Sequence, residues 1–276
     1  MRFEGVTDDE WARRRTRRLR ALFLSDVHLG TRACQGERLI DFLNHHEADT
    51  IYLVGDIIDG WRLRSTWYWP ASHKDILQVL LRAAWKGTRI VYLPGNHDAF
   101  LRDYYGRHFG GIEVVEQAIH VAADGRRYLV VHGDHFDRSL RHTRRFAFLG
   151  GTALRLTVGA DRALDAVRTM LGLSSPWSPS RWVKRRVKQA TRYLDDYEQS
   201  LADIARRHAV DGVICGHVHH AAIHDDFGVR YINCGDWLES CTAVAETADG
   251  DFELLRWIGK TPRGEPSLII NEARTA

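Results

Sequence analysis

The chain lacks any long apolar run. No window of its 276 residues approaches the roughly 20 apolar residues that a membrane-spanning helix needs. An apolar signal core is also missing, because residues 1–10 are polar and residues 11–20 are rich in arginine. We therefore expect a cytoplasmic protein.

Cysteine is scarce, and sequence repeats are absent. The four cysteines have no paired spacing, which argues against a disulfide framework and favours a reducing compartment. With 44% apolar and 27% charged residues, the composition is ordinary for a soluble globular protein. The length suffices for one α/β core, with or without an inserted segment.

Metal-binding residue types follow five mostly apolar, strand-like runs. The segments are Asp26-Val27-His28, Gly55-Asp56, Gly95-Asn96-His97-Asp98, His132-Gly133-Asp134 and Gly216-His217-Val218-His219. Apolar runs of this kind are typical of strands buried on both faces. Ligands collect at the carboxyl ends of the strands in open α/β sheets, so we expect these side chains to meet.

The residue types indicate a site for two divalent cations. Two cations can share a bridging carboxylate and hold the attacking and leaving oxygens of a phosphoryl transfer, at a separation of about 3.5–4 Å. Mixed oxygen and imidazole ligands suit Mn, Fe, Co or Zn, and the lack of a thiolate argues against a closed structural zinc site. Each segment alone could be a turn or a core histidine. Five in order favour a hydrolase of phosphate esters or anhydrides.

The order of these segments resembles the motif order of the calcineurin-like metallophosphoesterase superfamily. The second motif of that superfamily corresponds here to Gly55-Asp56-Ile57-Ile58-Asp59. The likeness runs from about Leu19 to about Trp257. It implies an α/β, four-layer sandwich of two central mixed β-sheets flanked by helices, with a helical lid insertion. We accordingly expect a basic leader (1–18), one core domain (19–137 and 205–258), an inserted lid (138–204) and a tail (259–276).

The same resemblance implies a role for each motif residue. One cation, Mn²⁺ before Fe, Co or Zn, would be held by Asp26, His28 and His219. The second would be held by Asn96, His132 and His217, and Asp56 would bridge the two. His97, oriented by Asp98, would contact the phosphate or protonate the leaving group. Asp59 would support the site by holding a histidine ring.

The flanking residues resemble one group of that superfamily, the UDP-2,3-diacylglucosamine diphosphatases. The pointers are the segment from Ser25 to Gly30, Trp61, the Cys234-Gly235-Asp236-Trp237 turn and the long insert. That group cleaves the pyrophosphate of a nucleotide-activated diacyl sugar, giving UMP and a lipid-linked sugar phosphate on the pathway to lipid A. Its best-known branch carries arginine where this chain has His97, which leaves a related substrate open.

The insert is strongly basic. Between Arg138 and Arg192 stand 13 Lys or Arg and two acids. We expect helices on both sides of Pro176 and Pro179, the second with an apolar stripe from Val183 to Ile204. A solvated helical hairpin, a lid for acyl chains and anionic groups, and a nucleic-acid surface are all compatible with this pattern, and the family resemblance favours the lid. Its candidate substrate contacts are Arg141, Arg144, Arg145, Phe146 and Trp177.

Aromatic and basic residues also follow the Gly55-Asp56 segment. Trp61 and Arg62 could stack a nucleobase and pair with phosphates, or belong to a packed loop before a helix from about Ser72 to Trp85. A further helix is expected from Ala99 to His108. The expected partners are an anionic nucleotide-lipid substrate and, peripherally, the cytoplasmic face of the inner membrane. The alternative is a phosphodiesterase or phosphatase acting on nucleotides, cyclic nucleotides or nucleic acid.

Overall fold

The computed structural model describes residues 16–136, 179–260 and 266–271, with the backbone alone at 179–190, 259–260 and 266–271. The chain divides into two compact units, Met1–Asp134 with Leu201–Ala276, and His135–Ser200. The five substrate contacts predicted in the insert, from Arg141 to Trp177, lie outside the described residues. Among the helices that are described, none is both long and apolar enough to cross a membrane.

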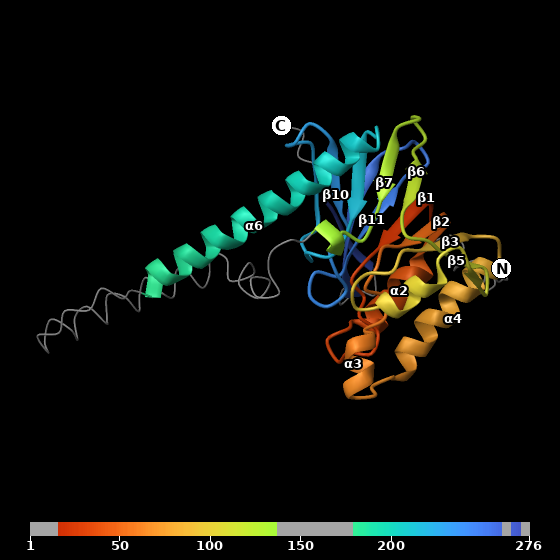
Figure 1. Ribbon diagram of the computed structural model, residues 1–276. Coiled ribbons are helices and arrows are strands. Elements are labelled where there is room, and N and C mark those ends of the chain that lie inside the picture. Colours follow the sequence, from red (N-terminus) through yellow and green to blue (C-terminus); the bar gives the residue numbers. More distant parts are fainter. Residues whose placement is uncertain (1–15, 137–178, 261–265, 272–276) are drawn as a thin grey trace, which may run out of the picture. The chain divides into compact units, whose positions relative to one another are not determined.

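The larger sheet has eight strands, in the order β13-β12-β11-β1-β2-β3-β5-β4 (Figure 1). Its strands are β1 (Arg17–Leu24), β2 (His46–Leu53), β3 (Arg89–Tyr92), β4 (His108–Phe109), β5 (Ile112–Val114), β11 (Thr242–Glu246), β12 (Phe252–Lys260) and β13 (Pro266–Asn271). The run β1-β2-β3-β5 is parallel, and β11, β12 and β13 extend it in antiparallel fashion beside β1. The first strand of the chain therefore lies at the centre of this sheet.

The smaller sheet has five strands, in the order β6-β7-β8-β10-β9. They are β6 (Ala118–Val121), β7 (Arg127–Val130), β8 (Gly212–Cys215), β9 (Ala222–His224) and β10 (Arg230–Asn233). β7, β8 and β10 are parallel, while β6 and β9 form hairpins with their neighbours. The two mixed sheets expected from the family resemblance are thus confirmed.

Alternation along β1 shows how both faces of the larger sheet are buried. Leu22 and Leu24 join a core cluster with Leu39 and Ile76 of the covering helices, whereas Phe23 joins a cluster with Ile214 of the smaller sheet. Successive side chains of a strand point to opposite faces, so a continuous apolar run fills both cores. The helices are α2 (Gly36–His45), α3 (Gly60–Ser65), α4 (Ala71–Trp85) and α6 (Pro179–Arg207), with the 3₁₀ turns η1 (Ala99–Tyr104) and η2 (Asp134–Phe136).

Three local expectations were wrong. The helix expected from Ala99 to His108 is the short turn η1 followed by β4, because Tyr105 is not helical and Gly106 adopts a φ of +77°. The segment after the second aspartate of the Gly55 motif is not a loop but the helix α3. The range expected to be a tail contains β13, which pairs with β12.

His46, where α2 meets β2, should make stability fall in acid. Burial among Phe42 and Trp257 lowers the pKa of His46, and Arg17 and His45 contribute in the same direction. The hydrogen bond from His46 Nδ1 to the Phe42 carbonyl opposes this shift, and the resulting pKa is about 4. Between this value and the ordinary pKa near 6.5, the unfolded chain binds more protons than the folded one, so the free energy of unfolding falls as pH decreases. Denaturant titrations should show wild type losing about 2 kcal/mol more than His46→Gln between pH 7 and 5. Equal losses in the two proteins would contradict this.

Candidate metal centre

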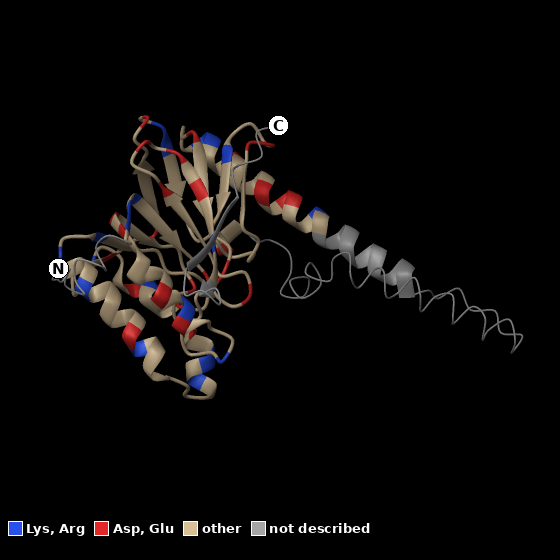
Figure 2. Ribbon diagram, turned by 180° about the vertical axis from the view of Figure 1, so that it is seen from behind, with Lys and Arg blue, Asp and Glu red and all other residues tan. Residues whose placement is uncertain are grey.

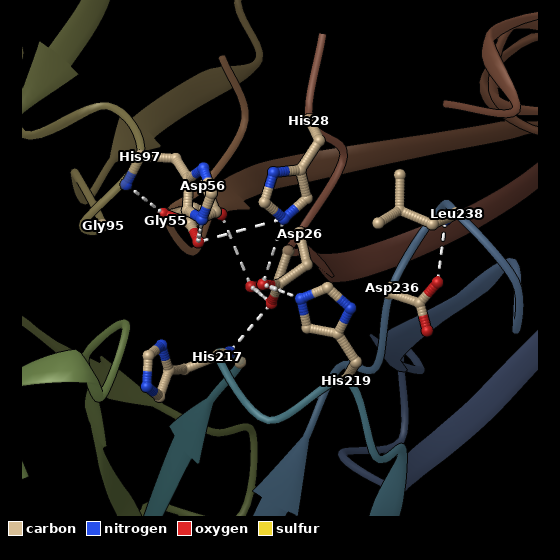
Figure 3. A network of polar contacts seen from close by, with 12 residues as sticks. Asp26, His28, Gly55, Asp56, Gly95, His97, His217, His219, Asp236 and Leu238 are labelled. Atoms are coloured by element: carbon tan, nitrogen blue, oxygen red, sulfur yellow. Dashed lines mark hydrogen bonds and ion pairs between the residues drawn. The ribbon is translucent and has the colours of Figure 1, made fainter. Parts of the chain in front are cut away.

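Each candidate ligand stands just after the end of a strand. Asp26 and His28 follow β1, Asp56 follows β2 and Asn96 follows β3, which are neighbours in the larger sheet. In the smaller sheet, His132 follows β7, and His217 and His219 follow β8. Parallel strands present their carboxyl ends at one edge, and the edges of the two sheets meet at these residues (Figure 3).

The candidate ligands form two groups of potential ligand atoms, and a third group combines His28 with Asp59 and His97. The first comprises Asp26, His28 and His219, and the second comprises Asp56, His132 and His217; within each group the ligand atoms lie within 4.8 Å of one another. The His219 Nε2 lies 2.9 Å from Asp26 Oδ1, and the His132 Nε2 lies 3.4 Å from Asp56 Oδ2. Atoms bound to one cation at about 2.0–2.2 Å would be spaced by about 3–4 Å, so both groups fit a metal.

The groups are also joined to each other. The His28 Nε2 lies 3.7 Å from Asp26 Oδ1 in its own group and 3.9 Å from Asp56 Oδ2 in the other. The Asp56 Oδ2 thus lies near histidines of both groups. This is the place that a carboxylate shared by two cations must take.

Several buried atoms of these side chains make no hydrogen bond of good geometry among the described residues, although Asp26 Oδ1 and His219 Nε2 lie close to each other. They are Asp26 Oδ1, His28 Nε2, Asp56 Oδ2, Asn96 Oδ1, His132 Nε2 and His219 Nε2. A buried polar atom without a partner costs about 1–3 kcal/mol, so a cluster of six calls for a compensating ligand. Oxygen and imidazole nitrogen are the donor set of a divalent transition metal, which would satisfy all six.

The backbone at the site is strained in a consistent way. Asp26, His28, Asp56, His217 and His219 all have φ between 53° and 69°, in the left-handed region. Only two other non-glycine residues of the described chain share this conformation, Ala209 and Cys241. Such residues cost about 1–3 kcal/mol each and cluster at functional sites, where the surrounding structure holds them.

Hydrogen bonds set the direction of the ligand atoms. Ser25 Oγ and the His217 backbone N–H donate to Asp26 Oδ2, at 2.7 and 2.8 Å, which leaves Oδ1 for the centre. His132 Nδ1 donates to the Val54 carbonyl at 2.9 Å, so in the neutral ring, the form that binds a metal, the lone pair is on the Nε2 that faces Asp56. A histidine fixed in this way by a backbone carbonyl is typical of metal sites.

The field at the centre is strongly negative. Burial lowers the pKa of His28 and of His132, but the carboxylates outweigh it: Asp26 and Asp59 raise the pKa of His28 to about 9, and Asp56 raises that of His132 to about 10. Burial raises the pKa of Asp26, yet His219 and His28 hold it well below its ordinary value. The carboxylates that stabilise protonated imidazoles when no metal is bound also attract metal cations.

The structure corrects the role expected of Asp98 and shows which histidine rings Asp59 contacts. His97 Nδ1 lies 3.1 Å from Asp59 Oδ2, and His28 Nδ1 lies 3.3 Å from the same oxygen, so Asp59 supports both rings. Asp98, expected to orient His97, is fully buried and instead accepts hydrogen bonds from Tyr92 Oη at 2.5 Å and from four backbone N–H groups, those of Asp56, Ile57, Ile58 and Gly95. It holds the strained Asp56 turn in place.

Asp98→Asn is expected to weaken metal binding because the amide turns one acceptor oxygen into a donor that faces backbone N–H groups. We expect a loss of about 10–100-fold in Mn²⁺ affinity and in kcat/KM, as for other residues that hold metal ligands. Calorimetric titration with Mn²⁺ beside activity measurements checks this. Tyr92→Phe removes a single donor to the same carboxylate and should have a smaller effect. Unchanged Mn²⁺ affinity in Asp98→Asn would show that Asp98 does not position Asp56.

The residues expected to bind substrate divide by location. Trp61 and Arg62 lie on α3, which begins at the Asp59 cap where the Arg62 N–H donates to Asp59 Oδ1 at 2.8 Å. The Trp61 ring packs on His97, with ring centroids 4.2 Å apart, and the Arg62 side chain is exposed.

The role of Tyr92, which donates a hydrogen bond to Asp98, was not predicted from the sequence. A tyrosine at the end of a buried strand predicts only packing in the core.

The chain is similar to several known proteins. UDP-2,3-diacylglucosamine hydrolase of Porphyromonas gingivalis is 27% identical over 243 residues, covering 80% of this chain and 91% of the relative. The protein of the same name from Nitrosococcus oceani is 27% identical over 252 residues, covering 83% and 91%. Among solved structures, Vps29 of Entamoeba histolytica complexed with Zn²⁺ has a TM-score of 0.44 and 13% identity, covering 91% of this chain and 98% of its own.

A family match covers most of the chain and contains every candidate ligand. Residues 19–221 match calcineurin-like phosphoesterases. The segments from Asp26 to His219 all lie within that range. The chain belongs to the calcineurin-like phosphoesterase family and is a metal-dependent phosphoester hydrolase.

Proposed function

We propose that the protein hydrolyses the pyrophosphate of UDP-2,3-diacylglucosamine or a closely related nucleotide-lipid-sugar, releasing UMP and a lipid sugar phosphate. The observation that carries the hydrolytic part is the pair of ligand groups joined near Asp56, with six buried ligand atoms that make no hydrogen bond of good geometry among the described residues. The lipid substrate is supported by the names of the relatives, which cover about 80% of the chain at 24–27% identity.

We assign one divalent cation to Asp26, His28 and His219, and the other to Asn96, His132 and His217, with Asp56 shared. Mn²⁺ is the proposed metal, since a mixed set of oxygen and imidazole ligands suits it. When bound, the cations would supply positive charge for the phosphate oxygens and acidify a water nucleophile.

His97 is the proposed proton donor to the leaving group. Its Nδ1 faces Asp59 at 3.1 Å, so the ring keeps its Nδ1 proton there when Nε2 gives its own proton to the leaving group. Its Nε2 lies on the side of the centre, 3.9 Å from Asp56 Oδ2. Packing against Trp61 restricts the ring to this orientation. Trp61 and Arg62 are the proposed contacts for the uracil base and a phosphate.

His97→Gln is expected to separate turnover from metal binding. General acid catalysis contributes about 10²–10⁴-fold, so kcat should fall by at least about 100-fold. Metal content, measured by elemental analysis of the purified protein, should stay at the wild-type level because His97 is not an assigned ligand. Loss of metal from His97→Gln would make His97 a ligand instead.

The substrate is tested by turnover with Mn²⁺ in detergent micelles. UDP-2,3-diacylglucosamine is compared with UDP-N-acetylglucosamine, which lacks the two long acyl chains, and with bis(p-nitrophenyl) phosphate, and UMP is quantified by chromatography. Selective release of UMP from the diacyl substrate is the expected result. Hydrolysis of the simple diester without activity on the diacyl substrate would overturn the lipid assignment, while the phosphoesterase chemistry would stand.

A further inference from the structure

The α3–α4 surface exposes two tryptophans and two arginines. We use the term Trp67 patch for Trp61, Arg62, Arg64 and Trp67, all of which are exposed. Trp67 is 76% exposed and Trp61 is 53% exposed, so this surface presents two exposed tryptophans, whereas the comparably exposed Trp85 (74%) lies at the far end of α4. A single exposed apolar residue is ordinary, but two exposed tryptophans beside two arginines are typical of a binding surface.

The backbone beneath the patch is firmly held. Leu63 is half-buried between exposed residues of α3. It packs so closely against Gly30 that a Cβ added to Gly30 would lie 2.8 Å from the Leu63 Cγ. After Trp67, Trp69 packs on the larger core cluster and against His73, whose Nδ1 accepts a hydrogen bond from the Gly30 N–H at 3.0 Å. Trp67 is therefore presented outward by an ordered loop, and little conformational entropy opposes its insertion into a partner.

The charge around Trp67 has one sign. From Gly60 to His73 the chain carries Arg62 and Arg64 and no acid, and the next two residues, Lys74 and Asp75, pair with each other at 3.9 Å. The ribbon of α3 accordingly shows cationic segments in Figure 2. Asp59, just before this range, is buried and engaged with the two histidines, so it does not neutralise the surface. Arg32 adds a further cation over the Tyr68 ring, with its Cζ 4.7 Å from the ring centroid.

The patch is continuous with the candidate metal centre. Trp61 belongs to it and also packs on His97. An anionic surface bound by Trp67 and the arginines would therefore lie beside the candidate metal centre.

We propose that the Trp67 patch docks the enzyme on an anionic lipid bilayer. Tryptophan rings prefer the headgroup level of a membrane, and each arginine near an anionic leaflet adds about 1 kcal/mol of attraction. The proposal deepens the proposed function and rests on it for its purpose, because a diacyl substrate resides in a membrane and its headgroup would be presented next to His97.

The test is sedimentation of the full chain with phosphatidylcholine vesicles, with and without phosphatidylglycerol, in the absence of substrate. Wild type should bind only the anionic vesicles. Trp67→Ala should weaken this binding about tenfold, from the apolar area lost, and Arg64→Glu should weaken it by more than about fivefold, from the charge lost. Trp85→Ala is the matched control, because Trp85 is 74% exposed but lies at the opposite end of α4, about 20 Å along the helix.

Hydrolysis of the water-soluble bis(p-nitrophenyl) phosphate should be unchanged in all three variants, which shows that each is folded. Vesicle binding that survives both Trp67→Ala and Arg64→Glu, or that falls equally in Trp85→Ala, would overturn the proposal. Loss of a dimer in Trp67→Ala, measured by light scattering, without loss of vesicle binding would assign the patch to a second copy of the chain. Vesicle binding needs no turnover, so its outcome is independent of whether the diacyl substrate is cleaved.

Discussion

Replacing Asp56 with asparagine is expected to lower kcat/KM by at least about 10³-fold, because charge stabilisation by the cations is worth several kcal/mol and depends on a shared carboxylate. Asp56 is fully buried, and its Oδ2 lies 3.4 Å from His132 and 3.9 Å from both His28 and His97. The amide keeps the size of the side chain but removes the charge, so metal content should fall together with activity.

Elemental analysis and turnover of bis(p-nitrophenyl) phosphate measure the two effects in one preparation. Asp134→Asn is the matched control, since Asp134 belongs to the His132 motif but pairs with Arg102 at 2.8 Å. A partly exposed ion pair of this kind contributes at most about 1 kcal/mol to stability, and activity should be close to wild type. Wild-type turnover in Asp56→Asn would refute the bridging assignment, whatever the metal content.

Adding a single methyl group at Gly95 is expected to lower kcat/KM by about 10²–10³-fold, since a displacement of about 1 Å in a catalytic group costs about 100-fold. A Cβ at this position would lie 2.3 Å from Asp56 Oδ1 and 2.6 Å from His132 Nε2. Neither atom can retreat far, because Asp56 Oδ1 accepts the His97 N–H and His132 is held by the Val54 carbonyl. Two candidate ligands are thus displaced at once.

Gly87→Ala separates this effect from the general cost of replacing a glycine. Gly87 has a φ of +100°, but a Cβ there would meet nothing within 4 Å. The control should lose about 1 kcal/mol of stability from backbone strain and keep its activity. Thermal unfolding and turnover of both variants complete the comparison. Full activity in Gly95→Ala would mean that the ligands are not packed as described.

The motif segments were predictable because their chemistry is unusual and their position after apolar runs is repeated. The sequence indicates strands before Asp26, Asp56 and His217, and the structure has them there. The contact of His97 with Asp59 rather than with Asp98 was not predictable in this way. Asp98 is the sequence neighbour of His97, but η1 begins directly after it and its carboxylate turns toward the Asp56 backbone. The nearer residue in space is 38 positions away, and only the packing of α3 reveals it.

The other incorrect predictions of secondary structure also have physical causes. The residues from Ala99 to Tyr105 suit a helix, and the left-handed Gly106 that stops them can be recognised only from the backbone. The short helix α3 exposes most of its side chains, so it carries no apolar stripe that a periodic pattern could reveal. β13 follows a Pro- and Gly-containing stretch and becomes a strand through pairing with β12, a tertiary effect.

The position of β1 has a consequence for synthesis on the ribosome. β1 is the first of the described strands to be made, yet one of its two neighbours, β11, spans Thr242–Glu246, more than 200 residues later. The hydrogen bond from the His217 N–H to Asp26 likewise joins residues 191 positions apart. A nascent chain with β1, β2 and β3 outside the ribosome thus has an open sheet edge and only part of each ligand group. We expect metal capture and activity to arise together, after most of the chain has emerged, and we expect folding to be slow because its decisive contacts are the most distant in sequence.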